Sequence, residues 1–230
     1  VMSLRDAVTL VAQRGTLMQS MPPGAMLAVP LPEAQVRNLL TPDLSLSAVN
    51  GPSHCVVAGP VSAIDDLEKR LSAEQLRGRR LQTSHAFHSK MMEPMLQPFL
   101  EKVRRIKLNP PQLRYISNVT GKWIKNEEAT DPSYYAEQIR RAVLFSPGME
   151  CLLAEHDRVL LEIGPGSTLG ILAKQHPDPT ARRVIVSSLR GPSGTHTDTG
   201  SILSAIGGLW LAGIPIDWSA LYKEEKRKRV

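Results

Sequence analysis

Residues 44–58, LSLSAVNGPSHCVVA, carry the pattern that decides the fold. Apolar residues alternate with serine from Leu44 to Val49, which is the two-residue period of a half-buried strand. The apolar run His54–Ala58 predicts a second strand. Between them, Asn50–Ser53 contains the Asn-Gly pair of a hairpin, and the proline that follows indicates a longer loop. The stretch therefore predicts two antiparallel strands joined by a turn.

The flanking residues extend this hairpin into a β-α-β-β-α-β pattern. A strand at Ala25–Val29 and a helix at Pro32–Leu40 precede it, and a helix at Val61–Leu76 and a strand at Arg79–Ser84 follow it. This order is the ferredoxin-like plan, so residues 24–84 are expected to form a small subdomain. The plan does not indicate a function, because many unrelated activities share it.

Helices and strands also alternate on both sides of this segment. Helices are expected over 4–20, 91–106, 131–143, 146–156, 169–174 and 202–212, and strands over 113–119, 159–163 and 184–189. Alternation of this kind favours a parallel α/β core, here built from residues 1–23 and 85–190. These strands are too few for a complete sheet. We therefore expect an incomplete, hydrolase-like parallel α/β core with the ferredoxin-like subdomain inserted, and a preceding piece of polypeptide.

Composition narrows the class of protein. Hydrophobic residues make up 42% of the 230 and charged residues 22%, as in soluble globular proteins. The net charge of +6 owes much to Lys223–Arg229, which we expect to be a solvated tail. RNA-binding aromatics are missing from the strands, so no nucleic-acid partner is expected. No apolar run could span a membrane, and the N-terminus lacks the shape of a signal peptide. Cys55 and Cys151 lie in apolar runs and predict buried thiols in a reducing, cytoplasmic setting.

Residues 84–89, SHAFHS, stand at the corner between a predicted strand and a predicted helix. A histidine at such a corner has a fixed backbone and a ring that can face a cleft, which suits acid–base chemistry. His85 and His88 could instead be packing or surface residues. A metal site is not expected, because no third ligand has a suitable spacing.

Residues 164–167, GPGS, connect a predicted strand directly to a predicted helix. They are the nearest approach to a nucleophile elbow, but the sequence contains no G-x-S-x-G. The segment also lacks the residues of a phosphate loop. It is a packing turn or, alternatively, a turn whose backbone N–H groups face a cleft.

Eight short motifs follow one another along the chain. They are Arg14–Gln19 (RGTLMQ), Pro23–Met26 (PGAM), Ala48–Pro52 (AVNGP), Thr83–Ser89 (TSHAFHS), Met91–Met95 (MMEPM), Ser117–Gly121 (SNVTG), Val143–Phe145 (VLF) and Leu161–Gly166 (LEIGPG). Together and in this order they resemble the acyltransferase domain of modular type I polyketide synthases, a family related to the malonyl-CoA:acyl-carrier-protein transacylases. The resemblance extends from the first residue to about Leu189, and residues 191–230 resemble the linker that follows this domain.

The resemblance implies that a serine takes a malonyl unit from coenzyme A and passes it to the phosphopantetheine thiol of an acyl carrier protein, with no permanently bound cofactor. His88 matches the family's general base, and the backbone carbonyl of Leu144 would orient its ring. Arg14 matches the arginine that pairs with the free malonyl carboxylate, as a guanidinium can do through two hydrogen bonds. Met18, one helical turn further on, would line the same pocket, unless it only packs the helix face.

The same resemblance implies selectivity for the extender unit. The motif His85-Ala86-Phe87-His88 accompanies malonyl units in the family, and Phe87 would crowd an α-methyl group. Discrimination against one methyl group is worth about 1–3 kcal/mol, so a preference is expected. Asn50, in the AVNGP motif, is assigned to the substrate-binding residues with His85 and Phe87.

The chain departs from the family pattern at the nucleophile. The family's serine, in a GHSxG elbow, and its glutamine-containing oxyanion segment would lie upstream of Val1. These residues alone are therefore expected to be inactive. The partners expected from the resemblance are the N-terminal half of the acyltransferase, an upstream ketosynthase and the acyl carrier protein. The alternative is a non-catalytic piece of a megasynthase that serves as a docking platform for the carrier protein.

Overall fold

The computed structural model describes residues 1–155, 158–177, 183–191 and 197–223. They form two compact units, Val1–Ala154 and Glu155–Val230. This division does not coincide with the expected boundaries at residues 84 and 190, which stay predictions. The expected basic tail, except Lys223, lies outside the described residues, as does the end of the helix expected over 146–156.

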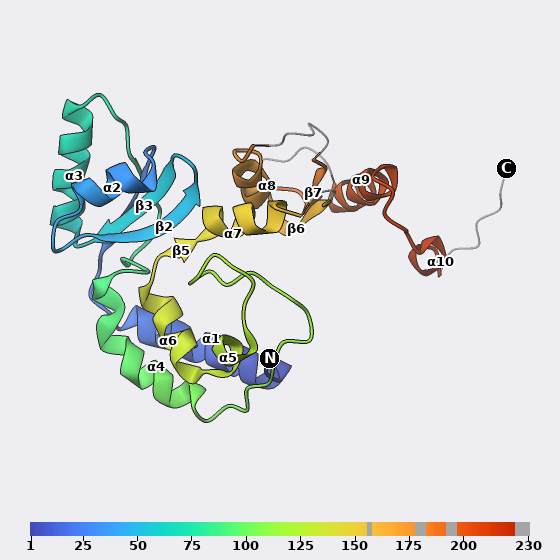
Figure 1. Ribbon diagram of the computed structural model, residues 1–230, viewed down its shortest axis with the longest axis horizontal. Coiled ribbons are helices and arrows are strands. Elements are labelled where there is room, and N and C mark those ends of the chain that lie inside the picture. The colour runs from blue at the N-terminus through green and yellow to red at the C-terminus, as the bar shows by residue number, and fades with distance from the viewer. Residues whose placement is uncertain (156–157, 178–182, 192–196, 224–230) are drawn as a thin grey trace. The chain divides into compact units, whose positions relative to one another are not determined.

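An antiparallel sheet with two crossover helices dominates the first unit (Figure 1). Its strands follow the order β4-β1-β3-β2, which confirms the predicted ferredoxin-like plan, and β5 adds to β2 in parallel. The elements are β1 (Ala25–Val29), α2 (Glu33–Leu39), β2 (Ser45–Gly51), β3 (His54–Gly59), α3 (Val61–Ala73), β4 (Arg79–Arg80) and β5 (Val143–Leu144).

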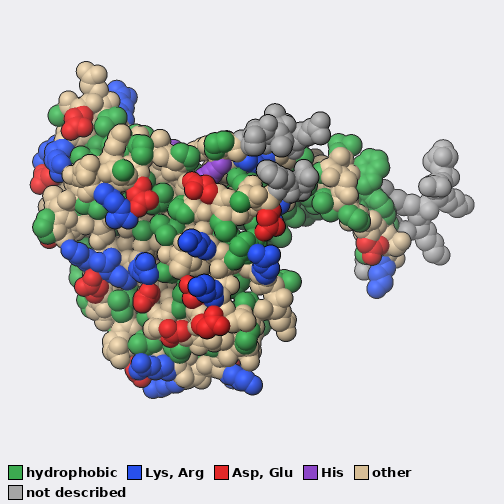
Figure 2. Space-filling model, in the orientation of Figure 1, with side chains coloured by type: hydrophobic (Ala, Val, Ile, Leu, Met, Phe, Trp, Pro, Cys, Tyr) green, Lys and Arg blue, Asp and Glu red, His purple; other side chains and the backbone are tan. Residues whose placement is uncertain are grey.

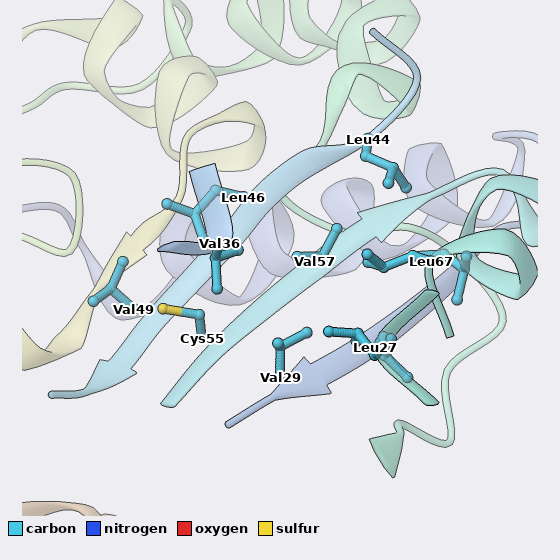
Figure 3. Close-up of a cluster of buried hydrophobic side chains, with 11 residues drawn as sticks. Leu27, Val29, Val36, Leu44, Leu46, Val49, Cys55, Val57 and Leu67 are labelled. Atoms are coloured by element: carbon cyan, nitrogen blue, oxygen red, sulfur yellow. The ribbon is translucent and has the colours of Figure 1, made fainter. Parts of the chain in front are cut away.

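One face of this sheet carries large apolar side chains and is covered by α2 and α3. Figure 3 shows strand residues meeting Val36 from α2 and Leu67 from α3. In β1 and β3 the two-residue period places the cluster members on one face, and the irregular pairing of β2 between Leu46 and Ala48 brings Val49 to the same face as Leu46. Its buried members are Leu27, Val29, Val36, Leu44, Leu46, Val49, Cys55, Val57, Ile64, Leu67 and Leu71.

The opposite face of the sheet is built mainly from small side chains. Ala28, Ala48 and Ala58 lie there together with Met26 and Val56. Small residues let a neighbouring segment approach the strands closely, and Ala86 packs on this face with no exposed surface. The sheet is thus buried on both sides, and the corner of residues 84–89 covers its small-residue face.

The strand predicted over Arg79–Ser84 is shorter than expected. Leu81 still donates its N–H to the carbonyl of Met26, at 3.0 Å, but Thr83 donates to Leu81 itself, at 2.9 Å. A bond between residues two apart closes a tight turn, and this turn ends the ladder. The chain then returns to the sheet, where Gly24 donates to the carbonyl of Ser84 at 3.1 Å.

A group of helices completes the first unit. Their buried residues are Leu10, Met92, Met95, Phe99, Val103, Ala136 and Ile139. Two predicted helix starts are confirmed: Ser3 caps the first helix through the N–H of Asp6, and Asp131 caps another through the N–H of Ser133. The helices are α1 (Leu4–Gln19), η1 (Lys90–Met95), α4 (Leu96–Val103), α5 (Asn126–Thr130), α6 (Pro132–Arg140) and α7 (Phe145–Leu153).

Two predictions in this region need correction. The helix expected over 91–106 begins as the 3-10 turn η1, because Pro94 has no N–H for an α-helical bond. The strand expected over 113–119 reduces to one bridge between Ile116 and Trp123. The hydroxyl of Ser117 accepts the N–H groups of two following residues and turns the chain there instead.

The second unit contains the predicted parallel strands, β6 (Leu160–Pro165) and β7 (Ile185–Leu189). Helices α8 (Thr168–Ala173), α9 (Asp198–Leu211) and α10 (Trp218–Leu221) accompany them. The carboxylate of Glu162 accepts the N–H groups of Leu169 and Gly170, at 3.1 and 2.9 Å. The GPGS turn therefore leads into a helix start that the chain's own carboxylate occupies, which favours the packing interpretation of that turn.

Basic and acidic side chains are interspersed on the face seen in Figure 2. None of the helices in the described ranges is long and apolar enough to cross a membrane.

The contact between Gly24 and the corner gives a test of the fold. A Cβ atom at Gly24 would lie 2.7 Å from the Cβ of Ala86 and 2.9 Å from its backbone nitrogen. We expect Gly24→Ala to lower the free energy of unfolding by about 1–3 kcal/mol, because backbone must shift to relieve the overlap. Urea denaturation followed by circular dichroism measures this change.

Gly15→Ala is the matched control, because a Cβ at Gly15 in α1 meets nothing within 4 Å. Alanine in a helix interior should raise stability by about 0.5–1 kcal/mol. Equal effects of the two substitutions would contradict the close approach at Gly24.

Candidate active site

Serine side chains of the sheet hold the corner of residues 84–89 in place through hydrogen bonds. The pairing of β2 with β3 is irregular at Ser47, because Leu46 opposes Val57 while Ala48 opposes Val56. Such a bulge re-aims a side chain, and the buried hydroxyl of Ser47 donates to the carbonyl of Phe87 at 2.8 Å. Two more bonds fix the exit from the corner. Ser45 accepts the N–H of Lys90, and Ser89 donates to the carbonyl of Ala86.

His88 follows directly on this anchored peptide and has a left-handed backbone, with φ of 55°. Few residues other than glycine adopt this conformation, and histidine is among those that tolerate it. It turns the ring toward the end of α6, where Nδ1 lies 3.0 Å from the carbonyl oxygens of both Gln138 and Arg141. Because both partners accept hydrogen bonds, Nδ1 carries the proton and Nε2 keeps its lone pair. Nε2 is thus the atom that can accept a proton from a nucleophile.

The carbonyl predicted to orient this ring was the wrong one. Leu144 lies on β5, pairs with Val49 and donates its N–H to the carbonyl of Asn118. The carbonyls that hold His88 come instead from the last turn of α6 and the residue after it. The last carbonyls of a helix have no partner within the helix, so they are free to accept a side-chain donor.

Arg14 reaches the same region from α1. Its Nη1 donates to the side-chain oxygen Oε1 of Gln138 at 2.8 Å. Burial lowers the pKa of the Arg14 guanidinium, but an arginine side chain stays protonated in proteins. Gln138 therefore contacts Arg14 through its side chain and His88 through its backbone. The structure brings together the predicted base and the predicted carboxylate clamp.

Burial and the positive charge of Arg14 both lower the pKa of His88 below the ordinary value of 6.5. The carbonyls of Arg141 and Gln138 act in the opposite direction but are outweighed. At neutral pH the imidazole is therefore uncharged, which is the form that a general base requires.

The other residues predicted for the site have different environments. His85 is buried, with Nδ1 2.7 Å from the hydroxyl of Ser84 and Nε2 3.1 Å from the carbonyl of Met21. Its ring lies 6.0 Å from that of Phe87, between centroids. Met18 is partly buried against the helical cluster of α4 and α6, and Asn50 is partly buried on β2.

A cavity of about 410 Å³ opens beside Arg14 and Gln138. The residues that line this cavity are mostly apolar. They do not include His88, Met18, Asn50 or Phe87. Within the described ranges, no group of three His, Cys, Asp or Glu side chains could hold a metal ion. The lining residues are Met2, Ala7, Leu10, Val11, Arg14, Phe99, Tyr115, Ile116, Asn118, Tyr134, Tyr135 and Gln138.

Sequence reasoning missed two residues of this site. Gln138 is one of several polar residues on an amphipathic helix, and nothing in its spacing distinguishes it. Ser47 belongs to a strand in which alternate serines indicated only the two-residue period. Its role depends on a bulge that no local pattern predicts.

Comparison with known proteins places these features in a family. The family model described as "Acyl transferase domain" matches residues 1–193. A component of the phenolphthiocerol/phthiocerol polyketide synthase of Mycobacterium tuberculosis is 39% identical over 219 residues, covering 95% of this chain and 15% of the relative.

Two solved acyltransferase domains have the same fold. The acyltransferase domain of ZmaA is 35% identical, with a TM-score of 0.90. The match covers 100% of this chain and 54% of the ZmaA chain. The acyltransferase domain of SpnD, solved in complex with 2-(pent-4-yn-1-yl)malonyl, is 37% identical, with a TM-score of 0.88. The match covers 93% of this chain and 52% of the SpnD chain. The chain thus spans about half the length of these domains and a small part of the curated relative. It belongs to the acyl transferase domain family, as found in polyketide synthases.

Proposed function

We propose that this chain is part of an acyltransferase that loads a malonyl unit from malonyl-CoA onto the phosphopantetheine thiol of an acyl carrier protein. The observation that carries the proposal is that Gln138 contacts both a neutral, oriented His88, through its backbone carbonyl, and a partly buried Arg14, through its side chain. A base beside a guanidinium suits a substrate that has a thioester at one end and a carboxylate at the other.

His88 acts on both halves of the transfer. Nε2 accepts the proton of a serine hydroxyl as the serine oxygen bonds to the thioester carbon. The tetrahedral intermediate then expels the coenzyme A thiolate, which takes the proton from Nε2, and a serine ester remains. The carrier protein's thiol next gives its proton to Nε2, and its sulfur attacks the ester. The serine oxygen leaves and recovers that proton.

The serine belongs to the proposal but not to these 230 residues, since they contain no G-x-S-x-G. The N-terminal half of the domain would supply it, and a ketosynthase and the carrier protein would be the other partners in the synthase. We place the protein in the cytoplasm, because Cys55 and Cys151 are both free thiols. The proposed transfer uses only the serine, His88, the thioester substrate and the thiol of the carrier protein, so no permanent cofactor is proposed.

Phe87 is proposed to set the preference for malonyl over methylmalonyl. The carbonyl of Phe87 accepts a hydrogen bond from Ser47, and its ring centroid lies 6.0 Å from that of His85, so these contacts help to hold Phe87 in the corner. Its place next to the base is what supports this assignment.

Intact-mass spectrometry with malonyl-CoA tests the proposed function. We expect a malonyl adduct when this chain is joined to, or mixed with, the N-terminal half of the domain. The adduct should be lost or slowed about 10²- to 10⁴-fold in His88→Gln, because the general base is removed. Transfer of the adduct to an acyl carrier protein completes the test.

His54→Gln serves as the matched control, because His54 lies at the start of β3, opposite Gly51, and is not part of the proposed site. An adduct on this chain alone would contradict the assignment of the nucleophile. No adduct with two associated halves would favour the docking-platform alternative.

The lowered pKa of His88 predicts the pH dependence of serine acylation. The base must be neutral, so kcat/KM should rise with pH through the pKa of His88 in the free enzyme and level off above it. Because burial and Arg14 lower that pKa, the midpoint should lie below pH 6.5. A stopped-flow or quench profile between about pH 4.5 and 8 measures it, and a midpoint above about 7 would contradict the environment described for His88.

Arg14→Gln should remove the preference for a carboxylate. A hydrogen bond to a charged group contributes about 1.5–3 kcal/mol, so kcat/KM for malonyl-CoA should fall about 10- to 100-fold. Activity with acetyl-CoA should fall much less. The ratio of the two rates is the measurement, and a ratio unchanged from that of Arg5→Gln, an exposed arginine of α1, would exclude Arg14 as the clamp.

A further inference from the structure

Gln138 contacts both the guanidinium of Arg14 and the imidazole of His88. Its Oε1 accepts from Arg14 at 2.8 Å, and its backbone carbonyl accepts from His88 at 3.0 Å. The guanidinium and the imidazole are therefore held in a fixed relation, and neither can shift without disturbing Gln138. Arg141 provides the second carbonyl for the same ring, also at 3.0 Å.

The charged groups around His88 differ in whether they are neutralised. On and after α6, Arg140 pairs with Glu93 of η1 at 2.8 Å, and Arg141 pairs with Glu137 at 3.3 Å. Arg14, from α1, is different. Among the described residues its hydrogen-bond partner is the uncharged amide of Gln138 and no carboxylate. Its charge is the one that remains uncompensated beside the ring.

The other histidine of the corner, His85, is not a second uncompensated charge beside the ring of His88. Both ring nitrogens of His85 are engaged, by the hydroxyl of Ser84 and the carbonyl of Met21. Burial is the larger cause of the lowered pKa of His88, and Arg14 is the charged group that adds to it.

We propose that a carboxylate bound at Arg14 strengthens His88 as a base, with Gln138 holding the two groups in the relation that this coupling needs. The inference rests on the proposed function and deepens it. An unpaired guanidinium opposes the imidazolium that forms when His88 takes the nucleophile's proton. A substrate carboxylate neutralises the guanidinium and removes that opposition. An acyl group without a carboxylate leaves it in place.

Arg14 therefore discriminates twice. It favours binding of the carboxylate, and its charge opposes proton transfer to His88 whenever no carboxylate is bound to neutralise it. An interaction that grows in the transition state raises kcat, whereas uniform binding affects KM alone. Selection of malonyl over acetyl units should thus be visible in the chemical step.

A histidine NMR titration of the chain tests the coupling without any need for activity. The six histidines are labelled with ¹³C at Cε1, and the His88 signal is identified by its loss in His88→Gln. We expect the pKa of His88 to rise in Arg14→Gln, because a nearby positive charge is removed. Arg5→Gln removes an exposed charge about 13 Å further along the same helix and should leave the titration unchanged.

Arg14→Lys separates charge from packing. It keeps the positive charge, so the pKa of His88 should stay close to that of the unaltered chain. An equal shift in Arg14→Gln and Arg14→Lys would mean that packing is responsible and would overturn the proposal, as would no shift in Arg14→Gln relative to Arg5→Gln. A ¹H–¹⁵N correlation spectrum shows that each variant is folded. If Arg14→Gln unfolds, Arg14→Met supplies the neutral side chain in its place.

The complete domain gives the second measurement. In single turnovers, the acidic limb of the maximal rate with malonyl-CoA should lie at higher pH than the limb of kcat/KM, because the bound carboxylate raises the pKa of His88. With acetyl-CoA the two limbs should coincide. Coincident limbs with malonyl-CoA would overturn the coupling but leave the proposed function intact, whereas a shift by NMR without any malonyl adduct would sink the function alone.

Discussion

Close packing of residues 84–89 on the small-residue face of the sheet is the constraint on which the site depends. Ala86 is fully buried there against Ala28, Ala48 and Ala58, so a larger side chain at any of these positions would push the corner outward. The corner also loses water, and its backbone groups need partners inside the protein. Ser47 and Ser45 meet that need, and in doing so they fix the peptide from which His88 projects.

Two helices then act on the ring in opposite directions. The end of α6 offers carbonyl oxygens, whose partial negative charge favours the imidazolium. Burial of the ring lowers the pKa of His88, and the positive Arg14 of α1 adds to this effect, so the neutral form prevails. The ring of His88, the proposed base, is oriented by α6, its pKa is lowered by burial and by Arg14 of α1, and Gln138 contacts both His88 and Arg14.

Much of this arrangement follows from the sequence. The two-residue period of 44–58 and the helical periods around it predict the ferredoxin-like sheet, because burial on one strand face leaves few alternatives. Family resemblance identified His88 and Arg14. The failures share a physical cause: they depend on where a regular element stops. The carbonyls that hold His88 are exposed only because α6 ends at Arg140, and the turn at Leu81 and Thr83 ends β4 through a bond that no periodicity reveals.

The use of carbonyls in place of an acid has a consequence for catalysis. In a serine–histidine–aspartate triad, a fixed carboxylate stabilises the imidazolium for every substrate. Here the ring is oriented by neutral groups, and the nearby full charge, Arg14, is of the wrong sign. A negative charge must come from elsewhere if the imidazolium is to be favoured. A dicarboxylic half-thioester brings that charge with it, so in the proposed function the carboxylate bound at Arg14 would also stabilise the imidazolium of His88.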